Sequence, residues 1–109
     1  MEGFVCACAT DNKIDLIDRH FGDAERYEIY TYTNGEFVRT GTVENTVPDE
    51  SAHGAAVKAR NIGSLLREYG VHVLVSRQFG PNLVKVKRSF VPVIARVQKI
   101  EDALALIES

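Results

Sequence analysis

The chain has 109 residues, of which 45% are hydrophobic and 26% are charged, and its formal net charge at pH 7 is −2. These totals are typical of one globular domain, so we expect a single domain over residues 1–109. The acidic balance excludes the basic surface of a typical nucleic-acid-binding protein, and no apolar run approaches the roughly 20 residues that span a membrane. We therefore expect a cytoplasmic protein without nucleic-acid or membrane partners, in which Cys6 and Cys8 are reduced thiols.

The first part of the chain predicts three strands. Residues 3–10 form a nearly continuous apolar run, which is typical of a strand covered on both faces. Residues 26–33 and 36–43 are rich in the aromatic and β-branched residues that strands favour. The dipeptide Asn34-Gly35 between them accepts the positive φ angles of a two-residue type I′ turn, so we predict an antiparallel hairpin.

The middle of the chain predicts a helix that ends at a glycine. Apolar residues recur there at spacings of four and three, which places them on one face of a helix. These residues are Ala55, Ala59, Ile62, Leu66 and Tyr69. Gly70 follows at the position where many helices end in a left-handed residue. We therefore predict a helix over residues 55–69.

The last part of the chain predicts strands and helices in alternation. Residues 71–76 and 90–96 are apolar enough to form strands. Between them, Pro81 suits the first turn of a helix that runs to Ser89. A further apolar stripe predicts a terminal helix over residues 100–107. The predicted order is therefore β-β-β-α-β-α-β-α.

This order predicts a three-layer α/β domain with a five-stranded mixed sheet and helices on both faces, because helical crossovers make the strands that they join parallel. The direction of the chain then places three loops at the edge that holds the carboxyl ends of the parallel strands. We call this edge the rim, and its loops are residues 11–25, 44–54 and 77–81. Proteins with α/β sheets usually bind ligands at this edge, so we expect a site at the rim.

Three short motifs fall on the rim. They are "HFG" (His20, Phe21, Gly22), a middle loop that begins "VEN" and contains His53 and Gly54, and "GPN" (Gly80, Pro81, Asn82). Together these motifs resemble those of the dinitrogenase iron–molybdenum cofactor family, of which the chain looks like a stand-alone member. The resemblance implies a ribonuclease H-like sheet and a bound metal–sulfur cluster of the iron–molybdenum type or a related one. It also implies that His20 is a ligand of the cluster.

Each candidate ligand also has an ordinary structural explanation. His20 either supplies an imidazole to a cluster or is a loop histidine bonded to a flanking acid, with Phe21 in the core and Gly22 in the turn. His53 is either a second donor or an exposed residue at the start of a helix. Cys8 lies near the rim end of its strand, but free cysteines are usually buried core residues, so core packing is the preferred interpretation.

The other rim residues suggest binding through backbone and charge. Gly80, Pro81 and Asn82 either present backbone N–H groups to an anion or only organise a helix start. The positive charges of Arg77, Arg19 and Arg26 could attract an anionic cluster. The 11–25 loop is acidic overall, which weakens this attraction. His72 lies between valines, where we expect a packed strand residue.

The sequence favours a carrier over an enzyme. It contains no Ser-His-Asp set, P-loop or G-x-G-x-x-G fingerprint, and "VCACA" occupies the strand on which a nuclease would carry acids. We expect a protein that binds a metal–sulfur cofactor and carries it, or helps to assemble it, between donor and acceptor proteins. The alternative is a metal-free interaction or regulatory module that uses the same rim. A monomer is favoured, because Pro92 makes the last strand a poor edge for pairing.

Overall fold

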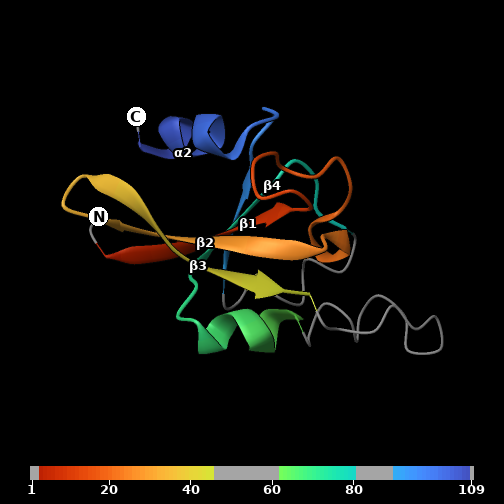
Figure 1. The fold of residues 1–109 in the computed structure, drawn as a ribbon, viewed down its shortest axis with the longest axis horizontal. Coiled ribbons are helices and arrows are strands. Elements are labelled where there is room, and N and C mark those ends of the chain that lie inside the picture. The colour runs from red at the N-terminus through yellow and green to blue at the C-terminus, as the bar shows by residue number, and fades with distance from the viewer. Residues whose placement is uncertain (1–2, 46–61, 81–89, 109) are drawn as a thin grey trace.

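A five-stranded mixed sheet forms the centre of the structure, a computed structural model that describes residues 3–45, 62–80 and 90–108 (Figure 1). Its strands are β1 (Phe4–Thr10), β2 (Arg26–Thr33), β3 (Glu36–Glu44), β4 (Val73–Ser76) and β5 (Val91–Ile94). They lie in the order β3-β2-β1-β4-β5. β1 pairs antiparallel with β2 and parallel with β4, β2 pairs antiparallel with β3, and β4 pairs parallel with β5. The predicted α/β architecture with a five-stranded mixed sheet is therefore confirmed.

In the part of the chain that the structure describes, two α-helical segments and one short 3₁₀ turn accompany the sheet. Helix α2 (Ile100–Glu108) agrees with the predicted terminal helix, and the 3₁₀ turn η1 (Phe21–Asp23) follows His20. Residues 62–68 are helical, whereas Tyr69 lies in the turn that follows and is 52% exposed. The prediction that the helix includes Tyr69 was therefore wrong by one residue. The rest of the predicted middle helix and the predicted helix from Pro81 to Ser89 lie outside the described residues.

The turns at the end of the sheet away from the rim have the predicted backbone conformation. Asn34 and Gly35 have φ angles of 52° and 80°, as a type I′ hairpin turn requires. Gly70 has a φ angle of 75°, which is the left-handed conformation expected after a helix. These positions connect strands and helices but contribute nothing to the rim.

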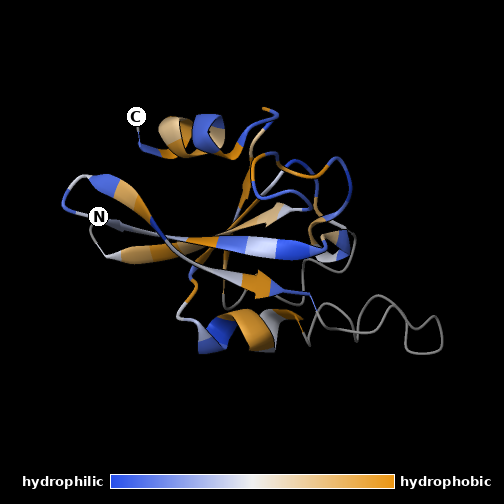
Figure 2. Cartoon of the chain, in the orientation of Figure 1, coloured by the Kyte–Doolittle hydropathy of each residue, from blue (hydrophilic) through white to orange (hydrophobic). Residues whose placement is uncertain are grey.

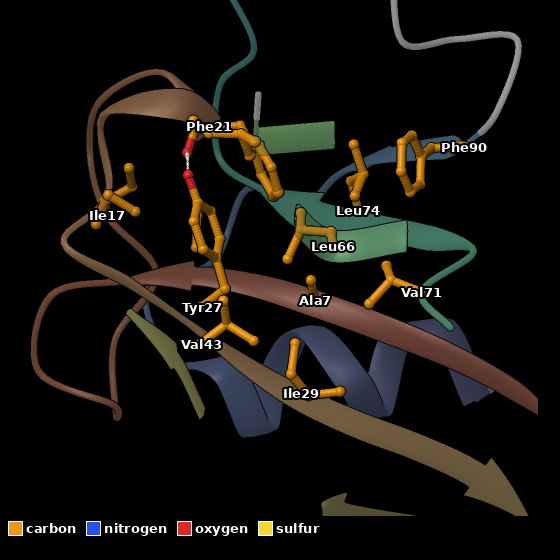
Figure 3. Packing of buried hydrophobic residues seen from close by; sticks show 13 residues of the cluster. Ala7, Ile17, Phe21, Tyr27, Ile29, Val43, Leu66, Val71, Leu74 and Phe90 are labelled. Atoms are coloured by element: carbon orange, nitrogen blue, oxygen red, sulfur yellow. Dashed lines mark hydrogen bonds between the residues drawn. The ribbon is translucent and has the colours of Figure 1, made fainter. Parts of the chain in front are cut away.

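The side chains of β1 alternate between two hydrophobic clusters, because successive residues of a strand point to opposite faces of the sheet. Ala7 and Ala9 belong to the cluster that contains helical Ile62 and Leu66 (Figure 3). Cys6 and Cys8 belong to the cluster that α2 covers with three buried residues, Ile100, Ala103 and Leu104. Figure 2 shows hydrophobic colour in both helical segments and in strands of the sheet. Both clusters pack against the central strand and make it a rigid base for the loop that follows it.

Candidate functional site

His20 lies beside the segment that follows β4. A parallel bridge joins His20 to Gln78, and the backbone N–H of Phe21 donates to the carbonyl oxygen of Gln78 at 2.9 Å. A Cβ atom built on Gly80 would lie 3.1 Å from Nδ1 of His20. The "HFG" motif and the first residue of the "GPN" motif are therefore neighbours at the rim.

The imidazole of His20 is exposed at this position. The side chain gives η1 no capping hydrogen bond, and within the described ranges no hydrogen bond or ion pair joins it to a flanking acid. Asp18, the nearest acid before it, instead approaches Arg77 and Gln78, with an N···O distance of 3.7 Å to the guanidinium. Within the described residues the imidazole of His20 therefore makes no hydrogen bond to a flanking acid, unlike the hydrogen-bonded loop histidine of the alternative interpretation.

Phe21 anchors the "HFG" motif in the hydrophobic core. Its side chain is only 6% exposed and lies between the rings of Tyr27 and Phe79, at centroid distances of 4.8 Å and 5.4 Å. The hydroxyl of Tyr27 donates to the carbonyl oxygen of Phe21 at 3.0 Å (Figure 3), and burial raises the pKa of this hydroxyl far above its ordinary value. A Cβ on Gly22 would make ordinary contact with Ile62 at 3.6 Å. Phe21 and Gly22 thus place the motif against the core, which leaves only His20 facing outward.

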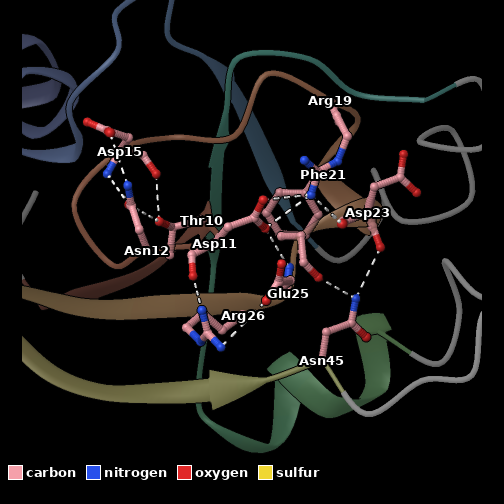
Figure 4. A network of polar contacts seen from close by, with 12 residues as sticks. Thr10, Asp11, Asn12, Asp15, Arg19, Phe21, Asp23, Glu25, Arg26 and Asn45 are labelled. Carbon is pink, nitrogen blue, oxygen red and sulfur yellow. Dashed lines mark hydrogen bonds and ion pairs between the residues drawn. The ribbon is translucent and has the colours of Figure 1, made fainter.

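The loop that carries His20 is closed by one carboxylate (Figure 4). Asp11 accepts a hydrogen bond from the backbone N–H of Glu25 at 3.0 Å and one from the guanidinium of Arg19 at 2.9 Å. Arg19 also donates to the carbonyl oxygen of Asp23 at 3.1 Å. Burial raises the pKa of Asp11, but the Glu25 N–H and the Arg19 guanidinium outweigh it, so the net shift of this pKa is downward. The carboxylate therefore holds both ends of the loop together in its charged form.

A second set of hydrogen bonds orders the first half of the same loop (Figure 4). The hydroxyl of Thr10 donates to the carbonyl oxygen of Asp15 at 2.6 Å, and Oδ1 of Asn12 accepts from the backbone N–H of Asp15 at 2.8 Å. Beyond this turn, the N–H of Leu16 donates to the carbonyl oxygen of Gln98 at 2.7 Å. The loop is thus tied to the sheet, to itself and to the segment before α2.

Three arginines that the structure describes near the rim are paired with carboxylates. The pairs are Arg19–Asp11, Arg26–Glu44 and Arg77–Asp18, with N···O distances of 2.9, 3.1 and 3.7 Å. Arg26 also donates to the backbone oxygen of Asp11. Because each guanidinium charge is already balanced by an acid, these residues hold the loops more directly than they attract an anion.

Cys6 and Cys8 are fully buried under α2. Cys8 faces Glu28 on β2 and Val75 on β4. The hydrogen bond with Cys6 and then burial raise the pKa of the Cys8 thiol well above its ordinary value. A protonated thiol in the core is a poor metal ligand, so the structure favours core packing for both cysteines. Across the described ranges, no three His, Cys, Asp or Glu side chains gather in a way that could hold a metal ion.

Four predicted site residues cannot be placed. His53, Gly54, Pro81 and Asn82 lie outside the described residues. The remaining histidine, His72, is exposed just before β4, at the end away from the rim. The expectation that it is packed inside a strand was wrong, because the strand begins one residue later.

Sequence reasoning missed two polar groups that lie deep in the sheet. Ser76 ends β4 at the rim, is fully buried, and its hydroxyl has no hydrogen-bond partner in the described part of the chain. Glu28 is also fully buried, but it accepts hydrogen bonds from Thr42 and Arg39 on β3. The only signal for Ser76 was a serine at the end of an apolar strand, which is too common to assign a role. Glu28 could have been found from the alternation of β2, which places it on the same face as Cys8.

None of the helical segments in the described residues is long and apolar enough to cross a membrane.

Comparisons with known proteins concern the fold of the whole chain. The chain is similar to the NMR structure of a protein from Methanococcus jannaschii whose name refers to a dinitrogenase. The TM-score is 0.64 and the identity 14%, over 99% of this chain and 89% of the other, which shows a shared fold. Among curated proteins, no match to this chain was found.

The family comparison covers the sheet, the rim and α2 together. The model of the family described as dinitrogenase iron-molybdenum cofactor matches residues 4–109, which is almost the full sequence. The match includes all three rim motifs, so the resemblance based on "HFG" and "GPN" is confirmed. This chain belongs to the dinitrogenase iron-molybdenum cofactor family.

Proposed function

We propose that this protein binds a metal–sulfur cofactor of the iron–molybdenum type or a related one, and carries it or helps to assemble it for transfer to an acceptor protein. Membership of the family supports a role in handling nitrogenase-type cofactors. The observation that carries the finer proposal is the exposed imidazole of His20, which is held at the rim by a backbone bridge and has no competing partner among the described residues.

The residues present fit a cluster better than a bare metal ion. A bare ion needs three or four protein ligands, and the described residues offer no such group. A preformed cluster brings its own sulfide ligands and needs only one or two donors from the protein. Imidazole is a suitable donor for iron and other transition metals. One exposed histidine on an ordered loop therefore suits cargo that must be held and then released.

The same features support a binding role without catalysis. Below His20 the rim is closed by a stack of aromatic rings, and around it the arginines are paired with acids. The "HFG" motif is thus held in place, with one ring nitrogen of His20 as the donor atom for the cofactor. We propose that the protein is not an enzyme, and that its partners are the proteins that supply and receive the cofactor. The strand order supports a ribonuclease H-like arrangement with helices on both faces as the frame for this role.

The proposal is tested by cofactor retention. Isolated iron–molybdenum cofactor is added anaerobically to the purified protein, and the iron and molybdenum that remain bound after gel filtration are measured. The wild type is compared with His20→Ala and with the control His72→Ala, which removes an exposed histidine at the opposite end of the sheet. We expect His20→Ala to retain at least about tenfold less cofactor, and His72→Ala to equal the wild type.

Two results would contradict the proposal in different ways. Equal retention by wild type and His20→Ala would remove His20 from the mechanism. No retention by the wild type, together with stable capture of a partner protein from its native host, would favour the metal-free interaction module instead.

A further inference from the structure

We infer that Gly80 is a positioning residue for His20, and that the structure offers the Nε2 atom of this histidine, and not Nδ1, to the cluster. The inference rests on the proposed function and adds two details to it. It assigns the atom that coordinates, and it gives a role to a residue that itself touches no cargo.

The first observation is the closeness of the imidazole to the backbone of residue 80. A Cβ atom placed on Gly80 would lie 3.1 Å from Nδ1, 3.5 Å from Cγ and 3.7 Å from Cβ of His20. Ordinary van der Waals contacts of a Cβ atom lie at 3.4–4 Å, so the contact with Nδ1 would be too close. A side chain at position 80 would therefore force the imidazole to shift from its present place by at least a few tenths of an ångström.

The second observation is that the backbone does not require glycine at this position. The glycines with positive φ angles in the described ranges are Gly3, Gly35 and Gly70. Gly80 is not among them, so an alanine could adopt its backbone conformation without strain. What glycine supplies at position 80 is space, and the atoms that occupy this space belong to His20.

These two observations decide which ring nitrogen is free. Nδ1 is the atom of His20 nearest to the position that a Cβ atom of residue 80 would take, so the ring turns this nitrogen toward residue 80. Nε2 is the ring nitrogen on the far side of the imidazole from this contact. A metal-bound histidine is normally held in one orientation by contacts to its other nitrogen and to its ring. Here the backbone bridge between His20 and Gln78 fixes the main chain, and the missing side chain of Gly80 leaves room for the ring.

The orientation also affects affinity. A side chain that is already held in its binding geometry loses less conformational entropy when cargo arrives. Substitution of Gly80 by alanine should free or redirect the imidazole without removing it. We therefore expect weaker retention through His20, although the donor is still present.

The test combines NMR spectroscopy with cofactor retention. In the wild type, nuclear Overhauser effects should connect the ring protons of His20 with the Hα protons of Gly80, and the corresponding effects should be weaker in Gly80→Ala. Retention of isolated iron–molybdenum cofactor by Gly80→Ala should be about tenfold weaker than by the wild type. The control is Gly41→Ala on β3, where an added Cβ meets nothing within 4 Å and φ is not positive, and this variant should bind as the wild type.

A double variant separates positioning from a structural effect. In the His20→Ala background, Gly80→Ala should cause no further loss of retention, because no imidazole remains to be positioned. An equal loss in both backgrounds would overturn the inference, as would absence of the ring-to-Gly80 Overhauser effects in the wild type. If His20→Ala loses the cofactor while Gly80→Ala retains it fully, the inference fails and the proposed function stands. If His20→Ala itself retains the cofactor, the proposed role of His20 fails and this inference with it.

Discussion

The hydroxyl of Tyr27 donates a hydrogen bond to the carbonyl oxygen of Phe21, and the two rings pack at a centroid distance of 4.8 Å. Tyr27 belongs to β2, whereas Phe21 begins the turn directly after His20. A buried strand residue therefore holds both the main chain and the side chain of the motif. This contact links the hydrophobic core to the position of the imidazole.

Replacement of Tyr27 by phenylalanine should destabilise the protein. The ring stays, but the carbonyl oxygen of Phe21 loses its buried hydrogen-bond donor, which costs about 1–2 kcal/mol. The free energy of unfolding in urea measures this loss. The control is Tyr32→Phe, because Tyr32 is only partly buried and substitutions at such sites change stability by about 0.5 kcal/mol or less. Equal effects of the two substitutions would show that the Tyr27 bond contributes nothing.

Stability should depend on the ionisation of Asp11 at acid pH. The folded protein holds the pKa of Asp11 below its ordinary value of 3.8. Its contribution to stability is therefore present above that ordinary value and is lost as the pH falls through the folded value. Asp11→Asn should lower the free energy of unfolding by about 1 kcal/mol at about pH 7, since solvent screens this partly exposed pair, and should have little effect at about pH 2. The same loss at both pH values would contradict this account.

The two cysteine thiols should be protected in the folded protein. Cys6 and Cys8 are fully buried, and the hydrogen bond with Cys6, followed by burial, raises the pKa of Cys8. In the native protein, a thiol-specific disulfide reagent should therefore react with the two cysteines only as fast as the protein unfolds. In denaturant, both thiols should react rapidly. Leu106→Cys supplies a control, because Leu106 is exposed on α2 and the introduced thiol should react rapidly in the native protein. Rapid reaction of the native wild type would show that the cluster under α2 opens.

The buried carboxylate of Glu28 should make the stability of the protein depend on Arg39, its ion-pair partner on β3. Glu28 is fully buried and accepts hydrogen bonds from Arg39 and, at 2.6 Å, from Thr42. Arg39→Ala removes the charge partner and should lower the melting temperature, because it leaves a buried carboxylate without its cation. The double variant Glu28→Met/Arg39→Met removes both charges and should melt at a higher temperature than Arg39→Ala. A double variant less stable than the single one would contradict this explanation.

The unpaired hydroxyl of Ser76 should reduce stability. A buried donor without a partner costs about 1–3 kcal/mol, and this hydroxyl has none among the described residues. Ser76→Ala should therefore raise the free energy of unfolding by about 1 kcal/mol, measured in urea. A loss of stability would show that the hydroxyl is bonded in solution.

Local chemistry made much of the sheet predictable. The φ preference of Asn34-Gly35 specified the hairpin turn, and Gly70 specified the end of the preceding helix. Both are properties of a few neighbouring residues. Hydrophobic periodicity gave the strands and, within the described residues, the terminal helix and the end of the middle helix, but not the exact bounds. Tyr69 and His72 were therefore each assigned to an element that stops or starts one residue away.

The site was predictable in outline only. The order of elements placed His20 and Gly80 at the same rim, because helical crossovers return the chain to one end of the sheet. Their contact depends on the backbone pairing of the "HFG" motif with Gln78, which joins segments far apart in sequence. The ion pairs of Arg19 and Arg77 depend on the same folded loop, and neither partner, Asp11 or Asp18, lies at a helical spacing from its arginine.

Because the chain is synthesised from its N-terminus, the loop around His20 is made before some of the residues that it bonds to. Its backbone bonds at Leu16 and Ile14 go to Gln98 and Ile100, near the start of α2. On the ribosome, residues 11–25 emerge long before these partners do. These bonds can therefore form only when the start of α2 has been synthesised, so the loop is completed when translation of this domain is almost finished.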